Sequence, residues 1–203
     1  CLADLDGNGA LDVVTADNSL SFHYYLNDGK ASFSNTLALV DEVEEAMCLA
    51  SGDMNGDGRI DIVGGNQGAR SLLFLNNGCV APFLGSKSST LPGDNETDTT
   101  AMTEADLNGD GFPDIITGNM NQRSLYYLND GSGMFFEGRP LTENNYKTTS
   151  VAAGDINQDG LPDVVAGNMK QKNKIYFNKE KGSGRNPRFP KTNTPRPPLP
   201  SAT

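Results

Sequence analysis

Residue types that commonly mark an active site or a membrane segment are scarce in this sequence. It has no tryptophan, one histidine (His23) and three cysteines among its 203 residues. No apolar stretch is long enough to cross a bilayer, and no GxSxG motif, Cys/His pair or phosphate-binding loop is present. A single histidine in the strand-like segment SFHYYLND favours a structural or surface role over catalysis. The sequence therefore predicts a non-catalytic chain without membrane insertion.

The few cysteines define neither a metal site nor a compartment. Cys1, Cys48 and Cys79 make an odd number, and their spacing contains no CxxC motif. Cys48 lies in the apolar segment AMCLA, where a small buried hydrophobe is the simplest interpretation. Cys1 and Cys79 both remain open to a disulfide, with a partner outside this sequence as one alternative.

Basic residues are also few, and they are unevenly distributed. The chain carries 16 Lys and Arg against 26 Asp and Glu, a net charge of -10. Five of the bases lie after residue 180, where there is no acid, so residues 1–180 hold 11 bases against 26 acids and carry -15. An acidic body of this kind repels nucleic acid and anionic membranes, and we expect neither as a partner.

A nine-residue motif occurs four times, as DLDGNGALD (4–12), DMNGDGRID (53–61), DLNGDGFPD (106–114) and DINQDGLPD (155–163). Every copy has Asp or Asn at positions 1, 3 and 5, glycine at position 6 and aspartate at position 9. A loop that alternates ligands with spacers points the ligands inward, and the glycine permits the turn that brings the carbonyl of position 7 round. The predicted side-chain ligands are Asp4, Asp6, Asn8 and Asp12; Asp53, Asn55, Asp57 and Asp61; Asp106, Asn108, Asp110 and Asp114; and Asp155, Asn157, Asp159 and Asp163. The predicted carbonyl ligands belong to Ala10, Arg59, Phe112 and Leu161.

This all-oxygen donor set predicts up to four Ca²⁺ ions, one in each loop, since calcium takes six to eight oxygens in flexible geometry. An EF-hand would need a glutamate at position 12, where the sequence has Thr15, Gly64, Thr117 and Ala166. Magnesium would demand a tighter octahedron with retained water. A turn of Asp, Asn and Gly without metal remains the alternative for any single loop. Because clustered carboxylates repel one another, we expect stability to depend on calcium.

The motif recurs at intervals of 49, 53 and 49 residues, and each copy leads into the same pattern of strands. The first runs are LDVVTA, IDIVGGN, PDIITGN and PDVVAGN, and the second are FHYYLNDG, SLLFLNNG, SLYYLNDG and KIYFNK. At a constant 23 residues after the first aspartate stands an asparagine, namely Asn27, Asn76, Asn129 and Asn178. Two further short strands are expected, one near the aromatic residues after the turn (Phe33, Phe83, Phe135, Phe136) and one leading into the next loop.

Four strands per repeat predict an all-β fold, a β-propeller built of four-stranded antiparallel blades. A solenoid or a sandwich is the competing interpretation, but solenoid coils are shorter than these repeats. The predicted repeats span about 1–45, 46–98, 99–147 and 148–180. The first blade lacks its leading strand and the last has no clear fourth strand, so we expect a partial propeller from a longer protein, with exposed sheet edges.

Two segments depart from the strand pattern. Residues 41–47 (DEVEEAM) have some helical character, although a charged linker is the simpler interpretation. Residues 181–203 form a basic, proline-rich tail that we expect to be disordered. The RPPLP sequence at 196–200 has the form of an SH3 ligand, but proline-rich linkers are commoner.

The loop, the following DxVxGN strand and the YLNDG turn resemble the FG-GAP/VCBS-type repeat of integrin alpha-subunit propellers and many secreted microbial proteins. The resemblance covers about residues 1–180. It implies a propeller, usually seven-bladed, with calcium loops between adjacent strands on one rim. The Phe-Gly and Gly-Ala-Pro signatures of the integrin repeat are missing here, so integrin-style ligand recognition is not implied.

The predicted function is a calcium-binding, extracellular or cell-surface interaction or adhesion module for a protein or glycan ligand. An accessory domain of a secreted hydrolase or lyase, or a calcium-stiffened spacer, is the alternative. The variable connectors at 81–100 and 137–149 are the candidate ligand surfaces, although they carry few aromatic residues. The acceptor sequence Asn95-Glu96-Thr97 is consistent with an extracellular location.

Overall fold

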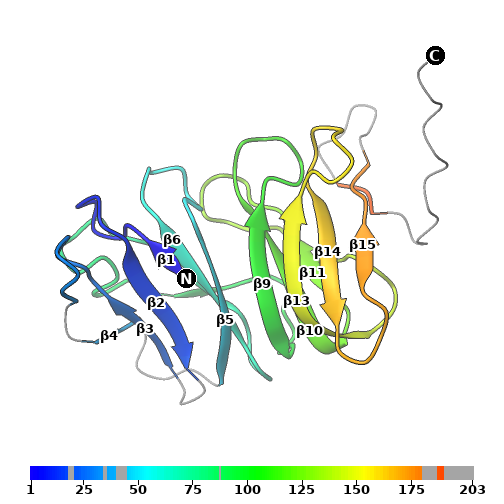
Figure 1. The fold of residues 1–203 in the computed structure, drawn as a ribbon, viewed down its shortest axis with the longest axis horizontal. Helices are drawn as coiled ribbons and strands as arrows, with labels where there is room; N and C mark the ends of the chain where they lie inside the picture. The colour runs from blue at the N-terminus through cyan, green and yellow to red at the C-terminus, as the bar shows by residue number, and fades with distance from the viewer. Residues whose placement is uncertain (18–20, 34–35, 40–44, 87, 180–186, 190–203) are drawn as a thin grey trace.

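Figure 1 shows a computed structural model of the protein, which describes residues 1–17, 21–33, 36–39, 45–86, 88–179 and 187–189. The regular structure within these ranges consists of fifteen β-strands with antiparallel pairing. The predicted all-β fold of four-stranded antiparallel blades is confirmed, as a partial propeller. No described segment forms a helix, so none forms a helix capable of crossing a membrane.

The first two repeats each form a separate four-stranded sheet. The first has the order β1 (Leu2–Ala3), β2 (Asp12–Asp17), β3 (Ser21–Tyr25) and β4 (Leu37–Ala38). The second has the order β5 (Ala46–Gly52), β6 (Asp61–Asn66), β7 (Leu72–Phe74) and β8 (Ser89–Thr90). In both sheets the nine-residue motif connects the first strand to the second, and its position-9 aspartate is the first residue of that second strand.

The third and fourth repeats share one seven-stranded sheet, which differs from the predicted separate blades. Its strands are β9 (Thr99–Ala105), β10 (Asp114–Gln122), β11 (Leu125–Tyr127), β12 (Arg139–Pro140), β13 (Tyr146–Gly154), β14 (Asp163–Asn168) and β15 (Lys174–Tyr176). β10 and β13 are nine residues long, and their extra residues pair through Met120 with Lys147 and Gln122 with Tyr146. The two blades are joined because these two strands run past the ends of their own blades.

Two details of the predicted strands are wrong. The first blade does have a leading strand, because Leu2 and Ala3 pair with β2 and the amino group of Cys1 donates to the carbonyl of Val14 at 2.7 Å. In the first three repeats the outer strand (β4, β8 and β12) begins a few residues beyond the aromatic residue near which it was expected. Phe33 and Phe135 each form only an isolated bridge, to Asn27 and Asn129. The turn holds the aromatic residue in this single bridge, and regular strand pairing resumes four residues later, at β4 and β12.

Apolar side chains form three core clusters, one between each pair of consecutive repeats. Strands β5, β9 and β13 lie side by side at the centre of the arc in Figure 1. Close packing between blades requires a glycine at one point, since a Cβ on Gly64 would lie 2.4 Å from the Cζ atom of Phe22 in the preceding repeat. Phe22 also meets Phe74 edge to face, with ring centroids 5.8 Å apart. The blades are therefore held together mainly by burial of apolar surface.

The fourth repeat continues to Phe189, beyond the predicted boundary at residue 180. The backbone N–H of Lys179 donates to the carbonyl of Arg188 at 3.1 Å, as Asp28, Asn77 and Asp130 do to the residue preceding each earlier aromatic. Phe189 packs edge to face on Tyr126 at 5.5 Å, in the way that Phe83 packs on Tyr24 at 5.4 Å. The expected disorder of the tail is therefore wrong for 187–189, where Pro187 is buried. Residues 180–186 and 190–203, including the RPPLP sequence, lie outside the described residues.

The remaining sequence predictions fall in strands or in undescribed residues. Ala46 and Met47 belong to β5, so the end of the DEVEEAM segment is strand, while residues 41–44 lie outside the described part of the chain. Cys48 is half-buried rather than fully buried, and burial raises the pKa of its thiol to about 12. Cys1, Cys48 and Cys79 are all free thiols, and Cys1 and Cys79 are exposed.

Candidate metal centre

The first aspartate of each motif organises its own loop. In the first loop, Asp4 accepts backbone hydrogen bonds from Gly7 and Gly9 at 2.9 Å and from Asn8 at 3.1 Å. Asp53, Asp106 and Asp155 accept the equivalent bonds from the amides of positions 5 and 6. The position-6 glycine has a positive φ in every copy, between 82° and 92°. This left-handed turn, favourable for glycine, wraps the loop around the position-1 carboxylate.

The position-9 aspartates Asp12, Asp61, Asp114 and Asp163 are fully buried at 0% exposure. Each accepts two backbone hydrogen bonds, one from the position-2 amide and one from the amide of the asparagine 15 residues later. For Asp61 these donors are Met54 at 2.9 Å and Asn76 at 2.8 Å. The other three copies repeat the pair of bonds at 2.7 to 3.1 Å. The position-9 carboxylate therefore connects the loop to the end of the third strand of its blade, in addition to any role as a ligand.

These buried carboxylates lie close to other negative charges. Burial raises the pKa of Asp61 to about 6 and that of Asp114 to about 7, although the two backbone hydrogen bonds act in the opposite direction. The carboxylates at positions 1 and 5 of the same loop raise both pKa values further. Burial also raises the pKa of Asp163. A cation in the loop would offset this unfavourable burial of negative charge.

The structure brings three predicted ligands of the first loop together. Oxygen atoms of Asp4, Asp6 and Asp12 all lie within 4.8 Å of one another. Two oxygens bound to one calcium ion at 2.3–2.6 Å are at most about 5 Å apart, so this trio fits a calcium ion. Each carboxylate oxygen that accepts one hydrogen bond keeps a further lone pair for a metal. The first loop therefore has the donor chemistry and the spacing for Ca²⁺.

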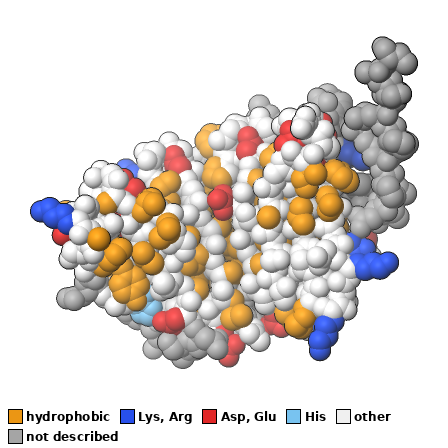
Figure 2. Space-filling model, in the orientation of Figure 1, with side chains coloured by type: hydrophobic (Ala, Val, Ile, Leu, Met, Phe, Trp, Pro, Cys, Tyr) orange, Lys and Arg blue, Asp and Glu red, His pale blue; other side chains and the backbone are white. Residues whose placement is uncertain are grey.

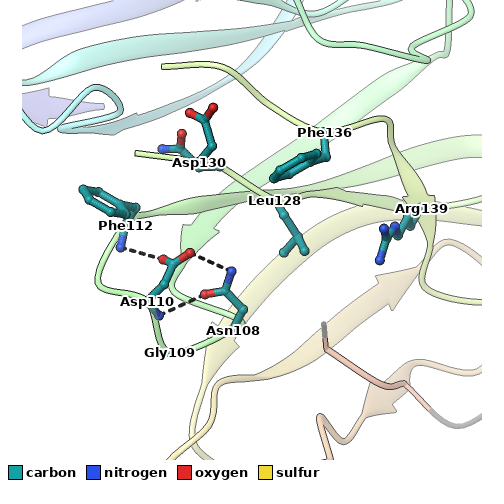
Figure 3. A pocket seen from close by; sticks show the side chains of 9 residues that line it. Asn108, Gly109, Asp110, Phe112, Leu128, Asp130, Phe136 and Arg139 are labelled. Atoms are coloured by element: carbon teal, nitrogen blue, oxygen red, sulfur yellow. Dashed lines mark hydrogen bonds between the residues drawn. The ribbon is translucent and has the colours of Figure 1, made fainter. Parts of the chain in front are cut away.

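In the other three loops, among the described residues, no three carboxylates meet within the same distance. Position 3 is asparagine in these loops, and position 5 makes other contacts. Asp57 accepts from the guanidinium of Arg59 at 2.5 Å and from the Asn55 side chain at 2.8 Å. Asp110 likewise accepts from the Asn108 side chain at 2.8 Å (Figure 3). Each of these loops still holds three aspartates and an asparagine at the same four positions, with the same loop backbone, so the ligand types are present.

The asparagine 23 residues after each first aspartate connects neighbouring blades. The side-chain amide of Asn76 donates to the carbonyl of Leu5 in the preceding loop at 2.8 Å. Asn129 donates to Met54 at 2.8 Å, and Asn178 donates to Leu107 at 2.7 Å. We refer to these three bonds as the interblade latch. Sequence reasoning noted the constant spacing of this asparagine but assigned it only to a turn, because its partner lies more than 70 residues away.

A pocket of about 620 Å³ opens beside the third loop. It is lined by Asn108, Gly109, Asp110, Phe112, Leu128, Asn129, Asp130, Phe136 and Arg139. In Figure 3 the ring of Phe136 lies next to Leu128, whereas the ring of Phe112 lies near Asp110 at one end of the pocket and Arg139 lies at the other. The pocket combines apolar surface with charges of both signs. His23 lies on β3, with its Nδ1 atom 3.2 Å from a carboxylate oxygen of Asp17.

Comparison with known proteins identifies the repeat and the fold. A family model described as FG-GAP-like repeat matches residues 4–64, 53–117 and 106–166. The structure is similar to a crystal structure of BBS1N in complex with ARL6DN, soaked with lead, with a TM-score of 0.58 at 13% identity over 87% of this chain and 51% of that one. A mercury-soaked structure of the same complex gives a TM-score of 0.55 at 14% identity over 83% and 46%. The V. cholerae biofilm matrix protein Bap1 gives 0.46 at 18% identity over 81% and 23%.

At these identities the likeness is one of fold. The chain spans about half the length of the BBS1N chain that it matches. No curated protein sequence matches it significantly.

Proposed function

Because the chain belongs to the FG-GAP-like repeat family, we propose that it is a calcium-binding β-propeller segment that acts as an extracellular, non-catalytic interaction module. The observation that carries the calcium proposal is the convergence of Asp4, Asp6 and Asp12 in a loop whose backbone is repeated three more times. The residues at positions 1, 3, 5 and 9 would hold the ion, with the carbonyl of position 7. Bound calcium would neutralise the clustered carboxylates and stiffen the connection between two strands.

The test of calcium binding is thermal unfolding of the full chain in CaCl₂ and in chelator, together with calcium titration by calorimetry. We expect a higher midpoint in calcium and a weakened first site in Asp6→Asn, which removes a carboxylate from the first loop. The matched control is Glu104→Gln, an exposed acid on β9 outside every loop, which should titrate like the parent chain. Identical melting in calcium and chelator would overturn the proposal.

The interaction role is supported by the pocket beside the third loop and by the fold. BBS1N, which shares the fold, was crystallised in complex with a protein, ARL6DN. The rings of Phe112 and Phe136 together with polar groups suit either a protein side chain or a sugar ring. A glycan array probed with the parent chain and with Phe136→Ala separates these ligand classes. Binding that Phe136→Ala abolishes assigns the pocket to glycans, whereas an array without signal favours a protein ligand.

The extracellular location rests on the family resemblance and on the exposed Asn95 of the acceptor sequence. An accessory role beside a secreted hydrolase or lyase is the second candidate for the longer protein. A hydrolytic activity of this chain, abolished by a single substitution, would contradict the non-catalytic assignment.

A further inference from the structure

The four motif loops lie along one edge of the molecule. In Figure 1, β9 and β13 end at the upper edge of the arc, and β2 and β14 begin there, so the loops that adjoin these strands follow one another along that edge. Acidic side chains recur along the same edge in Figure 2. Neighbouring loops belong to different repeats, so a direct connection between two loops has to cross from one repeat to the next.

Asn76 makes such a connection between the first and second loops. Its backbone N–H donates to Asp61, the position-9 aspartate of its own repeat, at 2.8 Å. Its side-chain amide donates to the carbonyl of Ile60 in the same loop at 3.1 Å and to the carbonyl of Leu5 in the first loop at 2.8 Å. The backbone N–H of Leu5 in turn donates to Asp12, the position-9 aspartate of the first loop, at 2.7 Å. Asn76 therefore lies between two predicted calcium ligands of different loops.

The surroundings hold Asn76 in a single orientation. Its Oδ1 atom accepts from the N–H of Gly78 at 2.9 Å, and its backbone carbonyl accepts from Nε of Arg59 at 3.1 Å. If the side-chain amide were reversed, its oxygen would face two carbonyl oxygens, so only one orientation satisfies all of these bonds. The residue is 2% exposed, and water does not compete for its partners. This arrangement fits only when both loops are in place.

The same connection is repeated at the other two junctions. The asparagine N–H donates to the position-9 aspartate of its own repeat at 2.8 Å, and the side-chain amide donates to the position-2 carbonyl of the preceding loop at 2.7 to 2.8 Å. The hydrogen bonds form one series, in the order Asp12, Leu5, Asn76, Asp61, Met54, Asn129, Asp114, Leu107, Asn178 and Asp163. Every member is exposed by at most 3%, and bonds in a buried network of this kind depend on one another.

We propose that Asn76, Asn129 and Asn178 are positioning residues that couple the calcium loops of adjacent repeats, a role that rests on the calcium binding proposed for the loops themselves. When calcium holds a position-9 carboxylate, the asparagine N–H that is bonded to it is held as well. The side-chain amide of that asparagine is then aligned on the position-2 carbonyl of the preceding loop, whose own N–H holds the next position-9 carboxylate. Calcium in one loop therefore favours calcium in its neighbour, and the effect on the two affinities is reciprocal.

The position-6 glycines give a separate readout for each loop. Their amides donate to the position-1 carboxylates of their own loops at 2.8 to 2.9 Å, so each amide resonance should shift when its own loop binds calcium; they are Gly9, Gly58, Gly111 and Gly160. A calcium titration of the full chain followed by two-dimensional proton–nitrogen NMR therefore measures the four affinities separately. In Asn76→Ala the first and second loops each lose a hydrogen bond, and their affinities should fall about three- to tenfold. The third and fourth loops should stay within about twofold of the parent.

The matched control is Asn77→Ala. Asn77 is the next residue, is exposed, and bonds through its side chain to Leu84 and Cys79 within its own turn. All four loops should keep the parent affinities in this variant. If Asn76→Ala does not fold, Asn76→Ser takes its place, since the serine hydroxyl still accepts from a nearby backbone N–H but is too short to reach the preceding loop.

A double-mutant cycle tests the coupling itself. Asp53→Asn removes the position-1 carboxylate of the second loop and leaves the asparagine in place. In the parent chain this substitution should also weaken calcium binding in the first loop, by about threefold or more, whereas in the Asn76→Ala background it should leave the first loop unchanged. A purely electrostatic effect between the loops would be the same in both backgrounds.

The outcomes separate this coupling from calcium binding as such. Glycine resonances of the parent chain that do not respond to calcium would overturn the calcium proposal and the coupling together. Calcium binding that Asn76→Ala leaves unchanged, or weakens equally in all four loops, would overturn the coupling alone, because the asparagine would then serve only the stability of the fold. An equal effect of Asp53→Asn in both backgrounds would do the same.

Discussion

Replacing the buried aspartate of the second loop separates its structural role from its proposed role as a calcium ligand. Asp61 is fully buried and accepts hydrogen bonds from Met54 at 2.9 Å and from Asn76 at 2.8 Å. In Asp61→Asn one side-chain oxygen remains, so one of these backbone donors loses its acceptor and faces an amide group. Losing such a partner in the interior costs about 1–3 kcal/mol.

In the metal-free chain a second effect opposes this loss. Burial raises the pKa of Asp61 to about 6 from the usual 3.8, so the ionised form at pH 7 destabilises the fold by up to about 3 kcal/mol, at roughly 1.4 kcal/mol for each pKa unit. The neutral asparagine removes this penalty. We therefore expect the free energy of unfolding in chelator to change by less than about 2 kcal/mol, as the difference between these two effects.

In saturating calcium the balance changes, because the substitution also removes a carboxylate ligand. A site that binds only the folded state contributes about 2.7 kcal/mol at a hundredfold excess of calcium over its dissociation constant. Urea unfolding followed by circular dichroism, in CaCl₂ and in chelator, should show that the stabilisation by calcium falls by about this amount in Asp61→Asn. Glu104→Gln is the matched control for the loss of charge, because Glu104 is an exposed acid on β9 outside every loop.

Equal loss of stability in calcium and in chelator would refute this reasoning. It would show that Asp61 serves only to connect Met54 with Asn76, and that the second loop is a turn without a metal.

Three further outcomes are expected. Without calcium, the urea midpoint should rise as the pH is lowered from 8 to 5. The reason is that the pKa values of Asp61 and Asp114 in the folded chain, about 6 and 7, lie above the usual value for aspartate. The stability that protonation of these two groups contributes is complete below their pKa in the unfolded chain, and it is lost as the pH rises through their pKa in the folded chain. The double variant Asp61→Asn/Asp114→Asn should lose most of this slope, and a slope that persists in it would assign the effect to other groups. Asn129→Ala removes the hydrogen bonds to Met54 at 2.8 Å and to Pro113 at 3.1 Å, and it should lower the free energy of unfolding by about 2–4 kcal/mol. The control Asn145→Ala, at an exposed asparagine, should change this free energy by less than about 0.5 kcal/mol. Similar values for both variants would contradict a latch between blades. Phe189→Ala removes the ring that packs on Tyr126 at 5.5 Å, and it should lower the free energy of unfolding by about 1–2 kcal/mol in the same assay. The decrease should be larger than for Phe136→Ala, because Phe136 is 56% exposed. An unchanged free energy of unfolding in Phe189→Ala would show that the fourth repeat ends before residue 187.

Much of the fold could be predicted from the sequence because the information is local and repeated. The spacing of Asp4, Asp53, Asp106 and Asp155 defines the repeats, and the β-branched runs after each loop define the second and third strands. The loop backbone follows from the same letters, since each position-1 aspartate binds the amides of its own turn. Boundaries were less predictable, because the outer strands are two residues long and are fixed by pairing rather than by composition.

Phe189 illustrates why the end of the last repeat was missed. Its surroundings are basic and rich in proline, which predicts disorder. More residues separate Phe189 from Asn178 than separate the equivalent residues of the earlier repeats, so that counting from Asp155 does not find it. Only the packing on Tyr126 and the bond from Lys179 to Arg188 identify it as the aromatic residue of the fourth blade.

The sequence by itself determined the repeat, the all-β architecture and the oxygen-rich side chains of the four loops, since each depends on residues close together in the chain. The tertiary structure alone decided how the blades meet. It brought Asn76, Asn129 and Asn178 to carbonyls more than 70 residues away, and it brought three carboxylates together in the first loop while Arg59 turned toward Asp57 in the second. Such pairings depend on the angle between adjacent blades, which is set by the packing of side chains from both, and no local pattern in the sequence encodes that angle.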